Sequence, residues 1–85
     1  MKAVLLRRHG APGVLRVGQV ADPVAGPGQV LVRVGAVGVN YAEVLSRKGL
    51  YQWAPKRPYV LGMEAAGRIQ AVGAGVDPSR LGERV

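Results

Sequence analysis

The stretch GMEAAG, residues 62–67, places a carboxylate among small apolar residues. A carboxylate without a partner is costly to remove from water, so Glu64 in these surroundings needs a hydrogen-bonding or functional reason. Its neighbour Met63 carries a soft thioether, which suits the wall of a pocket better than acid–base chemistry. We therefore take Glu64 and Met63 as the first candidate site residues.

A second group of polar and aromatic side chains lies in GVNYAEVLSRKGLY, residues 38–51. Asn40 stands where an apolar strand pattern gives way to a helical one. Its amide could donate to a substrate carbonyl, or it could simply cap the helix. Tyr51 could orient a carbonyl and stack on a flat substrate, or be a partly buried loop tyrosine. Tyr41, beside Asn40, could line the same pocket.

Other residues with chemical potential have simpler explanations. Trp53 could cover a cleft as an aromatic lid, but packing onto the sheet is favoured because aromatic residues mostly supply buried area. Arg47 and Lys48 could approach a cofactor phosphate, yet their place at a helix end already suits the helix dipole. His9 is expected in an exposed turn, with no serine or cysteine nucleophile motif to serve.

Composition excludes several function classes. The chain of 85 residues contains no cysteine, which rules out disulfides and cysteine-based zinc sites. Its net charge of +7 is scattered along the chain, which favours an ordinary solvated surface over a nucleic-acid site. No apolar run reaches the roughly 18 residues that span a bilayer. We expect a cytoplasmic protein without membrane contact, and we find no G-x-G-x-x-G phosphate-binding loop.

The elements that position these residues are mainly strands. One helix of about two turns is expected, from Tyr41 to Lys48, with Asn40 as its N-cap and Gly49 as its stop. Proline- and glycine-rich stretches predict loops over 21–29 and 50–61. The turn-rich segment 74–85 leads toward a strand that does not appear, which would leave one sheet edge unpaired. Strands are predicted at 2–7, 14–20, 30–39 and 65–73, with bulges or a corner at Gly35 and Gly38.

Three segments occur in a fixed order that resembles a known family. They are HGAPGVL near the start, GVNYAEVLSRKGLY in the middle, and PYVLGMEAAGRIQAVGAGV followed by GERV. Together they resemble the N-terminal part of the medium-chain dehydrogenase/reductase superfamily, and within it the zinc-independent quinone oxidoreductase branch. The resemblance implies a mainly β fold: a GroES-like, partly open β-barrel with one short helix, from a protein that pairs a barrel with a Rossmann domain. Residues 1–85 would be the N-terminal part of the catalytic domain, with the Rossmann domain absent.

The resemblance also implies a site. The zinc-dependent branch carries a cysteine and a histidine where this chain has Asn40 and Met63, which are poor zinc ligands. We therefore expect no bound zinc, and a Glu64 that holds the pocket floor by hydrogen bonds. The resemblance implies that Asn40, Tyr41, Tyr51, Met63 and Glu64 line one pocket. There NADPH would pass a hydride to a quinone-like carbonyl.

Partners follow from the same resemblance. They are a quinone-like small molecule, the remainder of the enzyme, and a second copy in a homodimer. The chain alone would be inactive, because the cofactor's main binding domain lies outside it.

A different class of function remains as an alternative: a free-standing small basic β-barrel that binds RNA or a protein partner. The four aromatic residues do not interleave with basic residues on one strand face. This absence favours the enzyme over the binding module.

Overall fold

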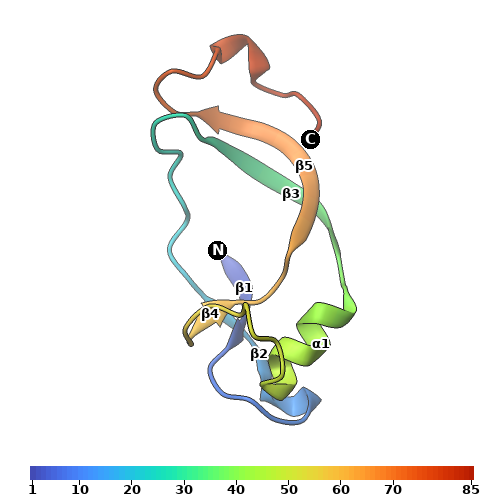
Figure 1. Cartoon of the computed structure of the whole chain (residues 1–85). Coiled ribbons are helices and arrows are strands. Elements are labelled where there is room, and N and C mark those ends of the chain that lie inside the picture. The colour runs from blue at the N-terminus through green and yellow to red at the C-terminus, as the bar shows by residue number, and fades with distance from the viewer. The chain divides into compact units, whose positions relative to one another are not determined.

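The computed structural model describes residues 1–85 and shows a mainly β chain with one α-helix and two open sheets. The chain forms two compact units. Unit 1 comprises residues 1–21 and 39–63, and unit 2 comprises residues 22–38 and 64–85. Figure 1 labels the elements of both units, and each unit is described by itself below.

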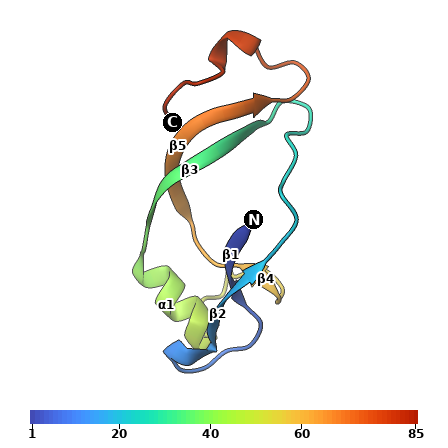
Figure 2. The same ribbon diagram turned by 180° about the vertical axis from the view of Figure 1, so that it is seen from behind.

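Unit 1 contains an antiparallel sheet of three strands in the order β2–β1–β4. Strand β1 (Lys2–Leu6) pairs along its whole length with β2 (Leu15–Gln19), as Figure 2 shows from behind. Leu5 and Leu6, which point to opposite faces, are both buried, and Leu6 exposes none of its surface. These two leucines anchor the sheet, because burial of a leucine side chain contributes about 1.5–3 kcal/mol.

The third strand, β4 (Tyr59–Val60), corrects the expectation of a plain loop over residues 50–61. Tyr59 pairs with Leu6 and Val60 with Leu5. A strand of two residues carries no readable periodicity, and it forms here because β1 offers it a free edge. This pairing fixes the direction of the segment that follows it.

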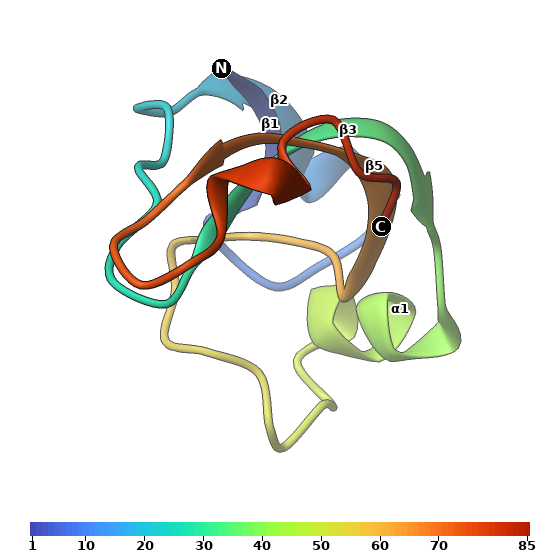
Figure 3. The same cartoon turned by 90° about the horizontal axis from the view of Figure 1, so that it is seen from above.

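The helix α1 (Tyr41–Lys48) has the predicted bounds and caps. Gly49 ends it in the left-handed conformation, with φ of 81°. The connection between β1 and β2 is tied to the helix end through Gly10, whose N–H donates to the Arg47 carbonyl and whose carbonyl accepts from the Arg47 guanidinium. Arg47 therefore has a structural role at the helix end. Figure 3 shows the long loop after α1, in yellow, extending outward from the helix.

Unit 2 is built on two long antiparallel strands, β3 (Val30–Gly38) and β5 (Glu64–Val72). The register shifts twice, once at the position of Gly35, as the glycine pattern predicts. Ile69 is the buried apolar side chain of this unit, at 2% exposed. Val34 and Val37 are largely exposed, so neither face of the second half of β3 is buried.

No further strand follows β5, as expected, but the C-terminal segment corrects the expectation of an unpaired sheet edge, because Arg84 forms an isolated bridge to Arg68. The backbone of Gly67 exchanges two hydrogen bonds with Val85, and Ile69 bonds to both Gly82 and Glu83. The last four residues therefore pair with the edge of β5 that does not face β3. The sequence pattern missed this pairing because GERV alternates too briefly to be read as a strand.

Candidate functional site

A cavity of about 370 Å³ lies within unit 1. One wall comes from α1, a second from the loop that follows it, and a third from β4 and the residues just after it. The size falls within the range of small-molecule pockets. The residues that line it are Glu43, Ser46, Tyr51, Trp53, Ala54, Pro55, Tyr59, Val60, Leu61, Gly62 and Met63.

The helix presents two buried polar side chains to this cavity, Glu43 and Ser46, each only 6% exposed. Their spacing of three residues places them on one helix face. The Glu43 Oε2 accepts a hydrogen bond of 2.6 Å from the backbone N–H of Asn40, as part of a capping box. The prediction that Asn40 is the N-cap is confirmed. The other carboxylate oxygen, Oε1, is buried and has no hydrogen-bond partner.

The loop after the helix supplies an aromatic wall. The rings of Tyr51 and Trp53 meet edge to face, with centroids 5.6 Å apart and planes at 68°. Such a pair contributes about 0.5–1.5 kcal/mol beyond the area it buries. Trp53 is 74% exposed, so the interpretation that it packs onto the sheet fits poorly, and its ring forms a rim of the cavity.

The third wall places Tyr59 and Met63 on the cavity. Tyr59 lies in β4, and its hydroxyl group is buried without a partner. Met63 is more than half exposed, so its thioether forms an adaptable edge of the pocket. The cavity therefore combines apolar and aromatic surface with two buried, unsatisfied oxygen atoms.

A smaller hollow of about 260 Å³ shares Ser46 and Tyr51 with this cavity. Its other side is basic, with His9, Lys56 and Arg57 among its residues. His9 is exposed, as expected, and lies against Gly49, where a side chain would collide with its ring. Tyr51 thus stands between an aromatic cavity and a basic hollow.

The structure brings together two of the five residues that the sequence predicts for a pocket. Tyr51 and Met63 line the same cavity, whereas Asn40 and Tyr41 do not. Tyr41 begins the helix with 68% of its surface exposed. Glu64 belongs to unit 2, where it opens β5 and pairs with Gly38. The roles of these residues in a shared substrate pocket stay predictions.

Sequence reasoning missed three polar side chains of the cavity: Glu43, Ser46 and Tyr59. Glu43 stands at the third helical position, where a capping-box residue is expected, and its spacing from Ser46 places the two on one helix face. No sequence signal pointed to Tyr59, because its position depends on pairing with β1.

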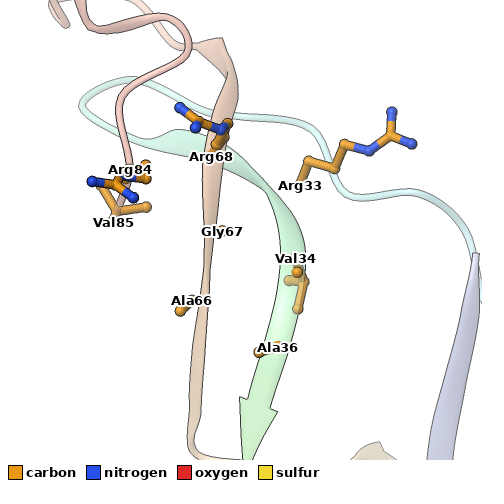
Figure 4. Close-up of a pocket in the computed structure, with 9 residues that line it drawn as sticks. Arg33, Val34, Ala36, Ala66, Gly67, Arg68, Arg84 and Val85 are labelled. Carbon is orange, nitrogen blue, oxygen red and sulfur yellow. The ribbon is translucent and has the colours of Figure 1, made fainter.

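Unit 2 contains a larger hollow of about 490 Å³, lined by the middle of β3, the middle of β5 and the C-terminal residues (Figure 4). Arg33, Arg68 and Arg84 lie around it. Figure 4 shows the Arg33 side chain extending away from Arg68 and Arg84, so the three guanidinium groups do not converge on one anion. Arg68 donates instead to the Gly82 carbonyl at 2.9 Å. We therefore place the candidate site in unit 1.

No three histidine, aspartate or glutamate side chains gather into a group that could hold a metal ion. The expectation that zinc is not bound stays a prediction. The helix α1 is neither long nor apolar enough to cross a membrane.

Comparison with known families gives the class of this protein. Residues 26–85 match the alcohol dehydrogenase GroES-like domain, and the chain belongs to this family. It is 40% identical over its whole length to the quinone oxidoreductase of Lama guanicoe, and 49% identical over 63 residues to the synaptic vesicle membrane protein VAT-1 homolog of Rattus norvegicus. The chain spans 26% and 16% of these two relatives.

Solved structures agree with this assignment. The Escherichia coli quinone oxidoreductase complexed with NADPH superimposes with a TM-score of 0.89 at 32% identity, over 99% of this chain and 26% of that one. The human VAT-1 homolog-like protein gives a TM-score of 0.93 at 35% identity, over 100% of this chain and 28% of that one. The expected GroES-like, mainly β fold and the resemblance to the zinc-independent quinone oxidoreductase branch are confirmed.

Proposed function

We propose that this chain is the N-terminal part of the catalytic domain of a zinc-independent oxidoreductase that reduces a quinone or enone carbonyl with NADPH. The observation that carries the proposal is the cavity walled by Tyr51 and Trp53 in unit 1. Flat conjugated rings suit such a wall. The quinone oxidoreductases among the relatives support the same reaction class.

The residues present fit the substrate side of such a site and not the nucleotide side. NADPH would supply the hydride, and the protein would supply geometry and exclusion of water. In this chain the Tyr51 hydroxyl would orient the carbonyl, while Trp53 and Met63 would cover the ring. No glycine-rich loop cradles phosphates here, so the nucleotide needs a further domain. A homodimer and a cytoplasmic location belong to the same proposal.

A chimera tests this function. The chain replaces the matching N-terminal quarter of the Escherichia coli quinone oxidoreductase, whose fold it shares. We expect NADPH oxidation that depends on an added quinone or enone, with the unaltered bacterial enzyme as the reference. The proposal would be overturned by a folded chimera that binds NADPH but does not oxidise it when any quinone or enone is added.

A further inference from the structure

Two oxygen atoms of the unit 1 cavity walls have no use in the fold. Glu43 Oε1 and the Tyr59 hydroxyl are buried without hydrogen-bond partners, and both side chains line the same cavity. Leaving such a group unpaired destabilises the fold, because its hydrogen bonds to water are lost and not replaced. A phenylalanine at position 59 would avoid the cost with the same shape. The pair therefore needs an explanation beyond folding.

The capping role of Glu43 does not supply that explanation. Its Oε2 alone accepts from the Asn40 N–H, and a glutamine at this helix position would cap equally well. Arg47, one turn further along, directs its guanidinium to the Gly10 carbonyl and so is engaged elsewhere. The second carboxylate oxygen is left for a ligand.

The chemistry of the two groups defines the ligand. A carboxylate oxygen can only accept a hydrogen bond, whereas a tyrosine hydroxyl can donate one and accept one. A ligand hydroxyl satisfies both, because its O–H donates to Glu43 Oε1 while its oxygen accepts from Tyr59. A plain quinone offers only carbonyl acceptors and could satisfy Tyr59 alone.

We propose that the cavity binds a planar ring that carries a hydroxyl group, held between Glu43 and Tyr59. The inference rests on the proposed function, since it names the substrate class of the same cavity: hydroxylated quinones or enones. Neither oxygen exposes surface to water. The ligand reaches them by displacing the edge of the cavity, where the Trp53 and Met63 side chains are more than half exposed.

The test is a binding measurement with 2-naphthol and its methyl ether, 2-methoxynaphthalene, on the full 85-residue chain. The ether matches the ring but cannot donate a hydrogen bond. Titration calorimetry is expected to show that naphthol binds at least about tenfold more tightly than the ether, which is the gain in affinity from one net hydrogen bond. Equal affinities, or no binding of either compound up to its solubility limit, would overturn the inference.

Two variants locate the discrimination. Tyr59→Phe removes only the hydroxyl, and Glu43→Gln keeps the helix cap but puts a donor in place of an acceptor. Glu43→Gln is expected to lower naphthol affinity toward that of the ether, because only the naphthol donates to Glu43. Tyr59→Phe is expected to lower the affinity for both compounds, because the oxygen of either one can accept from the Tyr59 hydroxyl. Glu83→Gln, on the exposed C-terminal segment, is the matched control. Discrimination that survives in Glu43→Gln, or a Tyr59→Phe variant that binds both compounds as tightly as the parent, would also overturn the inference.

The result is independent of turnover, because no cofactor is present. If Glu43→Gln does not fold, the inference is still tested by Tyr59→Phe and by the comparison of the two ligands on the unaltered chain. Hydroxyl discrimination in a chain whose chimera has no reductase activity would overturn the proposed function alone. An active chimera without discrimination would overturn only the inference drawn here.

Discussion

The Glu64 side chain lies against Gly38, its antiparallel partner across β3 and β5, so closely that any side chain at position 38 would overlap the carboxylate. Glycine weakens a strand interior and often marks a close approach of this kind. Glu64 itself is exposed. The desolvation cost that its apolar sequence neighbours suggest therefore does not arise.

Gly38→Ala is expected to lower the free energy of unfolding by about 0.5–1 kcal/mol, because the exposed Glu64 side chain must leave its present rotamer to make room for the methyl group. Urea unfolding followed by circular dichroism measures the change. Gly35→Ala is the matched control in the same strand, because its new methyl group would not collide with any atom. The nearest one, the Ala66 carbonyl oxygen, would lie at 3.8 Å. Adding Glu64→Ala should recover part of the Gly38→Ala loss. Equal losses for the two glycine variants would contradict the collision.

The helix cap gives a second prediction. Asn40→Ala should destabilise the chain by about 1 kcal/mol, because an N-terminal backbone N–H of α1 loses its acceptor. Asn40→Ser, which supplies another capping oxygen, should retain most of the stability. Thermal unfolding compares the three chains. An alanine variant as stable as the parent would mean that Asn40 is held at this position by something other than capping.

Tyr51 is the residue by which the substrate side of the proposed reaction can be tested. In the chimera with the bacterial enzyme, Tyr51→Phe should lower kcat about tenfold, the effect of one lost hydrogen bond in the transition state. The free energy of unfolding should change by less than about 0.5 kcal/mol, since the ring contact with Trp53 remains. Unchanged turnover would remove the hydroxyl from the proposed role.

Zinc should be absent from the purified chain. Asn40 and Met63 offer an amide and a thioether, which bind this cation poorly. Elemental analysis after dialysis without chelator is the measurement. One tightly held equivalent of zinc would contradict the argument that Asn40 and Met63 prevent zinc binding.

The C-terminal segment should loosen in acid. Hydrogen bonds from Arg80 to the carboxylate lower the pKa of Glu83 below 4.5, and a backbone hydrogen bond from Ser79 lowers the pKa of Asp77 below 3.8. A group whose pKa is lower in the folded state stabilises the fold at pH values above its pKa in the unfolded state. This contribution is lost as the pH falls through the pKa of the group in the folded state. The loss therefore begins below about pH 4.5 and continues below pH 3.8.

Amide hydrogen exchange can follow this change. The sequence predicts fast exchange throughout residues 74–85, but the amides of Gly82 and Val85 donate to β5, so protection at neutral pH is expected there. Their protection factors should fall on acidification, and less so in Glu83→Gln, which lacks the titrating group. Protection that is constant down to about pH 3 would contradict a role for these carboxylates.

Several elements were predictable because their signals are local. The helix from Tyr41 to Lys48 carries its own N-cap, its acidic first turn and its glycine stop, so neighbouring residues determine its bounds. The long strand from Val30 to Gly38 is rich in β-branched residues, and the glycine at position 35 marks the register shift. The ordered motifs determined the family in the same way.

The tertiary structure alone decided which side chains share the cavity. Tyr59 reaches it because a two-residue strand pairs with β1, more than fifty positions earlier in the chain, and no local pattern encodes that pairing. Glu43 has a capping spacing in the sequence, yet only packing leaves its second oxygen buried and unpartnered. Long-range pairing and burial depend on the whole chain, whereas caps and periodicity depend on a few neighbours. The sequence by itself therefore determined the family and the elements, and the fold decided the chemistry of the cavity.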